Sequence, residues 1–203
     1  MPWYQSIPPL LKTLGRNMVW HVPTDEKIIY LTFDDGPHPE ITPWVMDLLD
    51  TYGAKATFFC VGDNVVKYNS TFKAIEQRGH RCGNHTMTHM KGWNNPNKNY
   101  FEDIAACHAV VGSDLFRPPY GRIKPSQVSA LKKEYKIIMW SLLSCDFDKN
   151  LNREEALAGL KKHSSNGSIV VFHDSVKADQ NLKHLLPLYV QFLKEQGFIC
   201  KTL

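Results

Sequence analysis

Two adjacent acidic residues, Asp34 and Asp35, are the first residues of this chain whose spacing could do chemistry. They follow a mostly apolar run, Ile28–Phe33, that is typical of a buried β-strand. Gly36 and Pro37 break the strand, so both carboxylates lie where the backbone turns and side chains can converge. Adjacent carboxylates at the end of a buried strand are costly unless a cation balances them. The pair therefore indicates either a turn of solvated acids or part of a metal or catalytic site.

A pair of histidines, His85 and His89, follows a second strand-like run at residues 81–84. If the chain turns helical at Asn84, a residue type that caps helices, imidazoles four residues apart lie on one helix face. Such a pair can bind one divalent ion, and Asp35 could supply a third ligand. Asp34 would then be available to take a proton from water at the site.

Three further groups follow strand-like runs. The turn Arg117-Pro118-Pro119-Tyr120-Gly121 is rigid and could present a backbone N–H to a developing oxyanion, while Arg117 is a permanent cation that could hold an aspartate. His173 ends the apolar run 168–172 and could act as a general acid. Asp146 could orient this histidine and tune its charge. Each of these features alone is equally compatible with a surface loop or a partly buried polar residue.

The elements that must position these residues alternate along the chain. Strand-like runs cover residues 28–33, 56–61, 81–84, 115–117, 137–141, 168–172 and 198–201. Amphipathic stretches of helical period cover residues 42–50, 72–78, 153–163 and 182–196. This alternation predicts a parallel α/β fold, either a barrel or an open doubly wound sheet. No Gly-x-Gly-x-x-Gly sequence follows a strand, which counts against dinucleotide binding. In both folds the functional residues lie at the C-terminal ends of the strands, where the residues above cluster.

Composition limits the classes of protein that fit. The 203 residues, 43% of them hydrophobic, suit one domain, which we place at residues 28–203. An irregular lead-in covers residues 1–27, and residues 10–14 within it could form a short helix. The net charge of +4 is mild and scattered, which argues against a nucleic-acid partner. No apolar run is long enough for a membrane span. A monomer is expected.

The cysteines are odd in number, widely spaced and without a Cys-x-x-Cys pair. We expect small buried hydrophobic residues in a reducing compartment rather than disulfides or zinc ligands. The N-terminus shows no basic start followed by an apolar core, so no signal peptide is visible. Both observations favour the cytoplasm, whereas a substrate outside the cell would favour export. The five cysteines of the chain are Cys60, Cys82, Cys107, Cys145 and Cys200.

Taken together, five motifs resemble, in order, those of the NodB-homology polysaccharide deacetylases, carbohydrate esterase family four. They are Thr32-Phe33-Asp34-Asp35-Gly36-Pro37, His85-x-x-x-His89, Arg117-Pro118-Pro119-Tyr120-Gly121, Asp146-Phe147 and Val171-Phe172-His173. The resemblance spans about residues 28–200 and implies a distorted (β/α) barrel of about seven parallel strands in a single domain. It also implies a divalent metal, with zinc expected first and cobalt or nickel as alternatives. The implied reaction removes N-acetyl groups from N-acetylglucosamine polymers such as chitin or peptidoglycan, or O-acetyl groups from xylan in some members.

Position by position, the resemblance implies a role for each residue. The implied metal ligands are Asp35, His85 and His89. The implied catalytic residues are Asp34 as general base, Arg117 as its tether, Tyr120 as the backbone donor to the oxyanion, His173 as general acid and Asp146 as the partner of His173. Val171 takes the place of the apolar residue that lines the acetyl pocket.

The fourth motif departs from the family pattern, because Leu143 stands where an Asp is usual and Phe147 where a Trp is usual. Phe is smaller than Trp and cannot donate a hydrogen bond, so the wall of the substrate groove is altered. Trp93 and Trp140 could both offer a face on which a sugar stacks. Trp140 lies within an apolar run, however, and is expected in the core. Phe147 and Trp93 are therefore the further substrate-binding candidates beside Val171.

The expected function is metal-dependent deacetylation of a carbohydrate. A glycosidase also uses two acids, but they must flank a glycosidic bond about 5 Å or more apart, which adjacent Asp34 and Asp35 do not suit. A relative that binds carbohydrate without turnover is the alternative outside enzymes.

Overall fold

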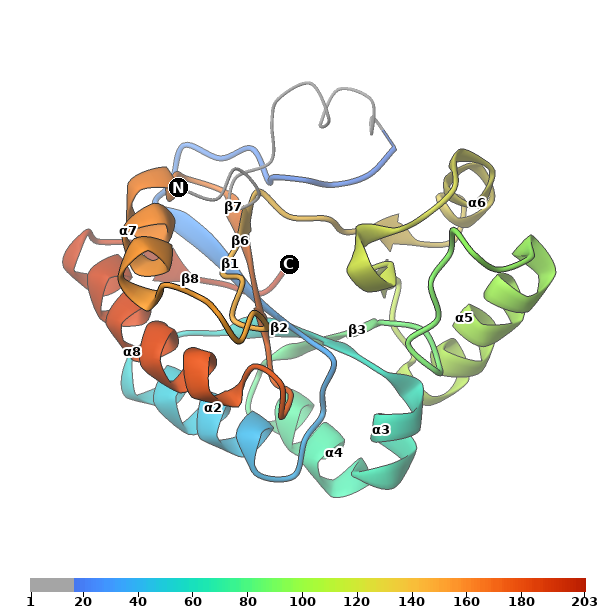
Figure 1. Ribbon diagram of the computed structural model, residues 1–203, viewed down its shortest axis with the longest axis horizontal. Coiled ribbons are helices and arrows are strands. Elements are labelled where there is room, and N and C mark those ends of the chain that lie inside the picture. Colours follow the sequence, from blue (N-terminus) through green and yellow to red (C-terminus); the bar gives the residue numbers. More distant parts are fainter. Residues whose placement is uncertain (1–16) are drawn as a thin grey trace.

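The computed structural model describes residues 17–203 as a layer of helices around a curled parallel sheet (Figure 1). The predicted helical turn at residues 10–14 lies outside the described residues. The strands are β1 (Ile28–Asp34), β2 (Ala56–Cys60), β3 (Arg81–Asn84), β4 (Leu115–Phe116), β5 (Lys136–Ile137), β6 (Leu142–Leu143), β7 (Ser168–His173) and β8 (Ile199–Cys200). The helices are α2 (Ile41–Thr51), α3 (Gly62–Lys67), α4 (Asn69–Gln77), α5 (Asn97–Val111), α6 (Pro125–Leu131), α7 (Arg153–His163) and α8 (Asp179–Glu195), with a 3₁₀ turn, η1, at Pro119–Gly121.

The sheet runs in the order β5-β4-β3-β2-β1-β7-β6, and all its pairings are parallel. The eighth strand, β8, pairs with β1 at Ile28 and Ile29, below the stretch of β1 that pairs with β2. Among residues 17–203 no pairing joins β5 to β6, so the sheet curls without closing. The expectation of a distorted barrel of about seven parallel strands in a single domain is confirmed.

The segment just before β1 contacts both sides of the gap that separates β5 from β6. Val19 forms a parallel bridge to Ile138, after β5, and His21 forms an antiparallel bridge to Ser168 on β7. The Val19 N–H donates to the Ile137 carbonyl, and the Met139 N–H donates to the Val19 carbonyl. Residues 19–21 of the expected lead-in therefore take part in the sheet.

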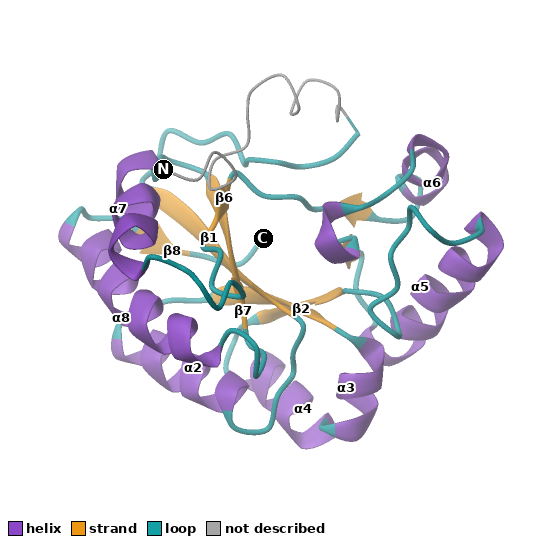
Figure 2. Cartoon of the chain, viewed as in Figure 1, coloured by secondary structure: helices purple, strands orange, loops and turns teal. Residues whose placement is uncertain are grey.

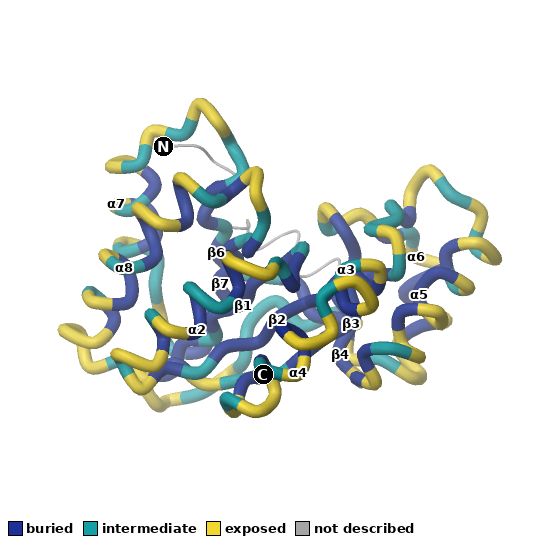
Figure 3. Tube along the Cα trace, turned by 90° about the horizontal axis from the view of Figure 1, so that it is seen from below, coloured by how far each residue is buried: buried dark blue, intermediate teal, exposed yellow. Residues whose placement is uncertain are grey.

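The helices cover the outer face of the sheet, where alternate strand residues are apolar (Figure 2). On β1, Ile29, Leu31 and Phe33 point into this outer core, whereas Thr32 and Asp34 point to the inside of the barrel. The helices α2 and α8 supply much of the opposing surface. Figure 3 shows the result, with buried strands in the middle and exposed residues on the outer turns of the helices.

Several elements differ from the sequence prediction. The helices α3, α5 and α6 and the strand β6 were not predicted, and the run 137–141 contributes only Ile137 to β5. Helix α5 begins with Asn97-Lys98-Asn99, which resembles a loop. Its buried residues Tyr100, Ile104, Cys107 and Val111 have helical spacing, and this spacing is the signal by which α5 could have been found.

The five cysteines are all buried and unpaired, as expected for small hydrophobic residues. Among the described residues, no helix combines the length and the apolar character needed to cross a bilayer.

Candidate active site

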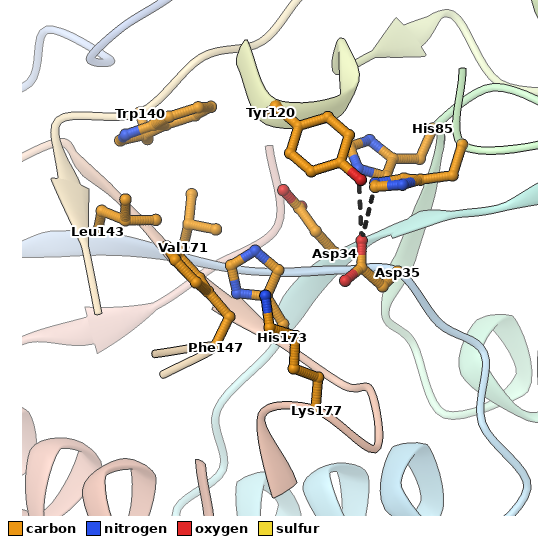
Figure 4. Close-up of a pocket in the computed structure, with 11 residues that line it drawn as sticks. Asp34, Asp35, His85, Tyr120, Trp140, Leu143, Phe147, Val171, His173 and Lys177 are labelled. Atoms are coloured by element: carbon orange, nitrogen blue, oxygen red, sulfur yellow. Dashed lines mark ion pairs between the residues drawn. The ribbon is translucent and has the colours of Figure 1, made fainter. Parts of the chain in front are cut away.

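The C-terminal ends of β1, β3, β4 and β7 meet at one cleft of about 390 Å³ (Figure 4). Asp34 ends β1 directly opposite His173, which ends β7, while His85 and Arg117 directly follow β3 and β4. The cleft is lined by Asp34, Asp35, His85, His89, Tyr120, Trp140, Leu143, Phe147, Val171, His173 and Lys177. The structure therefore brings together, at one cleft, residues that the sequence placed at the ends of strands.

Asp34 is held by an ion pair inside the barrel. The Arg117 guanidinium is fully buried and donates from one nitrogen to Asp34 Oδ1 and to Thr32 Oγ1, at 2.7 Å each. Its other donors reach the carbonyls of Ile138 and Met139, at 3.3 and 3.0 Å. Because all three guanidinium nitrogens donate hydrogen bonds, the orientation of the Arg117 side chain is fixed. Arg117 thus fixes the Asp34 carboxylate at the floor of the cleft.

Asp35 turns toward the same cleft because its backbone is left-handed, with φ at 79°. On an extended strand the side chain of Asp35 would point to the opposite face from Asp34. Instead its Oδ1 lies 3.1 Å from His89 Nε2 and 3.7 Å from His85 Nε2. Burial raises the pKa of the Asp35 carboxyl, but the hydrogen bond to His89 and the charges of His173 and His85 outweigh it, so the pKa is lowered overall.

The prediction of a helix from His85 to His89 is wrong, because this segment is not helical. The two imidazoles nevertheless meet, with ring centroids 5.1 Å apart. Thr86 and His89 have φ values of 65° and 58°, which no α-helix contains. Asn84 Oδ1 accepts from the Thr86 N–H, as a helix N-cap would, but Asp103 accepts from the N–H groups of Met87 and Thr88. The Asn84 carbonyl, to which the Thr88 N–H would donate in a helix, accepts from the Arg117 N–H at 2.9 Å instead. Partners from α5 and from the end of β4 thus replace the hydrogen bonds of a helix in this segment.

The donor set fits a divalent metal ion. Among residues 17–203, Asp35, His85 and His89 are the group whose donor atoms all lie within 4.8 Å of one another. His85 Nδ1 lies 2.8 Å from the Arg117 carbonyl, which can only accept, so Nδ1 carries the proton and Nε2 offers a lone pair to the cleft. Burial lowers the pKa of His85 to about 4, so the ring is neutral at pH 7. Two imidazoles and a carboxylate are a donor set that zinc accepts, with positions left for water.

His173 is clamped by a single carboxylate. Asp146 is fully buried; its Oδ1 lies 2.7 Å from His173 Nδ1, and its Oδ2 accepts from the His173 backbone N–H at 2.8 Å. Burial lowers the pKa of the imidazole, but the charge and hydrogen bond of Asp146 prevail, with help from Asp35, and raise it to about 9. A largely protonated imidazole with Nδ1 bound to a carboxylate directs its Nε2 proton away from that carboxylate.

An apolar wall faces His85 and His89 across the cleft. Leu143, Phe147 and Val171 lie on this side in Figure 4, so both departures from the family pattern are in the cleft itself. Trp140 lines the same wall and is only partly buried, which corrects the expectation that it belongs to the core. It leaves the sheet because the preceding carbonyls, of Ile138 and Met139, bind Arg117 instead of a neighbouring strand.

Trp93 does not line the cleft. It is 57% exposed, its indole N–H donates to the Ile123 carbonyl, and the Arg122 guanidinium lies 5.5 Å from its ring centroid. Its part in substrate binding stays a prediction. Tyr120 does line the cleft, in a left-handed conformation with φ at 59° and with its ring 4.7 Å from that of His89.

Other residues at the site were not predicted from the sequence. Lys177 lines the cleft, with its Nζ 5.2 Å from the Phe147 ring centroid. Asp103, Asn64 and Asp174 lie behind the cleft and hold the backbone that carries the candidate ligands. These residues act through hydrogen bonds to partners remote in sequence, and a single sequence gives no signal for such bonds. Only Asp174 could have been noticed in the sequence, because it directly follows His173.

Comparison with known proteins gives consistent matches. Residues 21–137 match a family model described as polysaccharide deacetylase. A peptidoglycan-N-acetylglucosamine deacetylase of Bacillus cereus is 35% identical over 89% of this chain and 88% of its own length. A chitooligosaccharide deacetylase of Azorhizobium caulinodans is 29% identical over 77% of this chain and 78% of its own.

A solved structure agrees with the fold. The crystal structure of a peptidoglycan N-acetylglucosamine deacetylase superposes with a TM-score of 0.88 at 27% identity, over 97% of this chain and 95% of that one.

Proposed function

The chain belongs to the polysaccharide deacetylase family, and from this premise we propose that it is a metal-dependent hydrolase that removes N-acetyl groups from a carbohydrate containing N-acetylglucosamine. The family expected from the five motifs is confirmed, and with it the enzyme class. The observation that carries the proposal is the convergence of three groups in one cleft. They are the donor cluster of Asp35 with two histidines, the Asp34–Arg117 pair and the His173–Asp146 pair.

A divalent ion bound by Asp35, His85 and His89 would supply Lewis acidity, which polarises an acetyl carbonyl and acidifies water at the site. Zinc suits this donor set best, and cobalt or nickel are alternatives.

The protein residues divide the proton transfers between them. Asp34 is placed to take a proton from the attacking water, while Arg117 keeps its carboxylate from rotating out of reach. The Tyr120 N–H is the proposed donor to the oxyanion that forms when the water oxygen bonds to the carbonyl carbon. As the carbon–nitrogen bond breaks, His173 gives its Nε2 proton to the departing amine, which is otherwise a poor leaving group. The products are acetate and a free amino sugar.

The apolar wall suits a small methyl group. Val171 and Leu143, beside His173 in Figure 4, would receive the acetyl methyl, and Trp140 and Phe147 would offer flat surfaces to the sugar. The two departures at Leu143 and Phe147 make this wall more apolar than the family pattern, so we expect them to affect the choice of substrate more than the proton transfers.

Acetate release from N-acetylglucosamine oligomers and from peptidoglycan, with acetylated xylan as a third substrate, tests the proposal. We expect acetate from the first two, with no shortening of the sugar chain. Release from xylan alone would favour an O-acetyl esterase, shortened chains a glycosidase, and no acetate from any substrate a relative that only binds carbohydrate.

Two variants separate the roles of metal and base. His89→Ala should lose metal binding and acetate release together, whereas Asp34→Asn should retain the metal and lose about 10²–10⁴-fold in kcat, as expected for removal of a general base. The exposed His184 and Asp25 lie outside the cleft, so His184→Ala and Asp25→Asn are matched controls. Full activity of His89→Ala without bound metal would refute the assignment.

A further inference from the structure

The loop that carries Asp35 is held by groups that the proposed reaction does not use. Asp35 is a non-glycine residue in the left-handed region, with φ at 79°, and this conformation is what brings its carboxylate to His85 and His89. Asp adopts this region more readily than most other non-glycine residues but still at a conformational cost, so the surroundings that fix the backbone on both sides help to keep Asp35 there.

Asn64 fixes the carbonyl side. It lies on α3, and its side-chain N–H donates to the Asp35 carbonyl oxygen at 2.8 Å. In the next residue, the Gly36 carbonyl accepts from the Val61 N–H at 2.9 Å. Helix α3 and the residue before it therefore hold two successive carbonyls of the loop.

Asp174 fixes the other side. It is 1% exposed; its Oδ1 accepts from the Gly36 N–H at 3.1 Å, and its Oδ2 accepts from the Thr42 hydroxyl at 2.5 Å. The Asp174 backbone N–H donates to the Asp34 carbonyl at 3.1 Å. A methyl group on Gly36 would lie only 2.1 Å from Asp174 Oδ2, so no larger residue fits between them. One aspartate thus ties the loop after β1 to the end of β7 and the start of α2.

We propose that Asn64 and Asp174 are positioning residues that hold Asp35 in its left-handed conformation and thereby set the affinity of the site for a divalent metal. Neither side chain lines the cleft, so both act through the backbone of the ligand. The inference rests on the proposed metal site. Removing a partner that orients a metal ligand typically weakens metal affinity by about 10–100-fold.

The test measures metal affinity, not turnover. The full chain, stripped with a chelator, is titrated with Zn²⁺ by calorimetry and with Co²⁺ by its visible absorption. Asn64→Leu removes the donor to the Asp35 carbonyl without adding charge, and Asp174→Ala removes the acceptor for Gly36. Each should raise the Kd for Zn²⁺ by about 10–100-fold and change the Co²⁺ absorption band.

Two controls distinguish positioning from loss of folding. Asn166 makes the same kind of bond, from its amide to the Asp25 carbonyl at 3.0 Å, on the exposed surface outside the cleft, so Asn166→Leu should leave the Kd unchanged. Asp174→Asn keeps an oxygen for the Gly36 N–H and should restore the affinity to within a few-fold of the natural protein. Thermal unfolding of the metal-free variants checks that they are folded, and if Asp174→Ala is not, Asn64→Leu decides.

The two possible failures are distinguishable. Equal Zn²⁺ affinity and an unchanged Co²⁺ spectrum in folded Asn64→Leu would overturn the inference and leave the proposed function standing. Absence of Zn²⁺ and Co²⁺ binding by the natural sequence would overturn both.

Discussion

The replacement Asp146→Asn should move the descending limb of the pH–rate profile to lower pH. Asp146 is fully buried, and both of its carboxylate oxygens are bound to His173, one to the ring and one to the backbone N–H. An asparagine has nearly the same shape, so it can still accept the backbone hydrogen bond. What it removes is the negative charge beside the ring.

The size of the effect follows from the pKa of His173. Against the opposing effect of burial, Asp146 is the largest cause that raises this pKa from 6.5 to about 9. The difference, 9 − 6.5, is 2.5 pH units, or about 3 kcal/mol in favour of the imidazolium. Without the charge, burial still acts, so we expect a pKa of 6.5 or below in the variant.

The sign follows from the role of the proton. The proposed reaction needs protonated His173, so activity should fall as the pH rises through the pKa of His173 in the folded protein. At pH 8 a pKa of about 9 leaves roughly 90% of His173 protonated, whereas a pKa of 6.5 leaves roughly 3%, so the variant should be about 30-fold slower at this pH. Near pH 6 the rates of acetate release by the two proteins should become similar.

The assay is kcat/KM for acetate release from a soluble N-acetylglucosamine oligomer between pH 6 and 10, at saturating Zn²⁺. The pKa of His173 is read independently from the NMR shifts of its ring. Asp148→Asn is the matched control, because Asp148 accepts from the Asn150 N–H and makes no contact with His173. A descending limb that stays near pH 9 in Asp146→Asn would refute the pairing as the source of the raised pKa.

Two further predictions concern stability. Arg117→Leu should lower the free energy of unfolding by about 3–5 kcal/mol in urea titrations, because it leaves the Asp34 carboxylate buried without its cation; a loss below about 1 kcal/mol would contradict this account. Burial lowers the pKa of His80 to about 4, with Lys55 contributing, and His80 Nδ1 accepts from the Ala56 N–H. Because the unfolded chain binds this proton with a pKa near 6.5, the contribution of His80 to stability is complete above pH 6.5 and is lost as the pH falls toward 4. Between pH 6.5 and 4, the free energy of unfolding of metal-free His80→Gln should therefore fall less than that of the natural protein, by on the order of 2 kcal/mol. If the free energies of unfolding of the two proteins change in parallel with pH, His80 is not responsible.

The position of the site could be predicted because it depends on topology alone. In a parallel sheet the C-terminal ends of adjacent strands meet at one edge, so residues that end or follow predicted strands must come together. Asp34, His85, Arg117 and His173 are all of this kind, and the structure places them around one cleft or, in the case of Arg117, directly beneath it.

The path of the backbone between these strands could not be predicted, because distant residues decide it. The segment from His85 to His89 has a spacing typical of a helix, but Asp103, on α5, accepts from the Thr88 N–H, which a helix capped at Asn84 would bond to the Asn84 carbonyl. Trp140 lies within an apolar run, but the carbonyls before it are bound by Arg117, which is remote in sequence. In both cases a buried polar group from another element overrides the local preference.

The burial of the Asp34–Arg117 pair has a consequence for how this protein could evolve. Arg117 lies 4.1 Å from the centroid of the Phe59 ring and donates to both β1 and the segment after β5, so the group that holds the proposed base is also part of the core. Losing either partner alone leaves a buried charge unbalanced, and the cost falls on folding before selection can act on activity. Drift toward an inactive relative should therefore begin at the partly exposed proposed ligands Asp35 and His89, where we expect a substitution to abolish metal binding at less cost to folding.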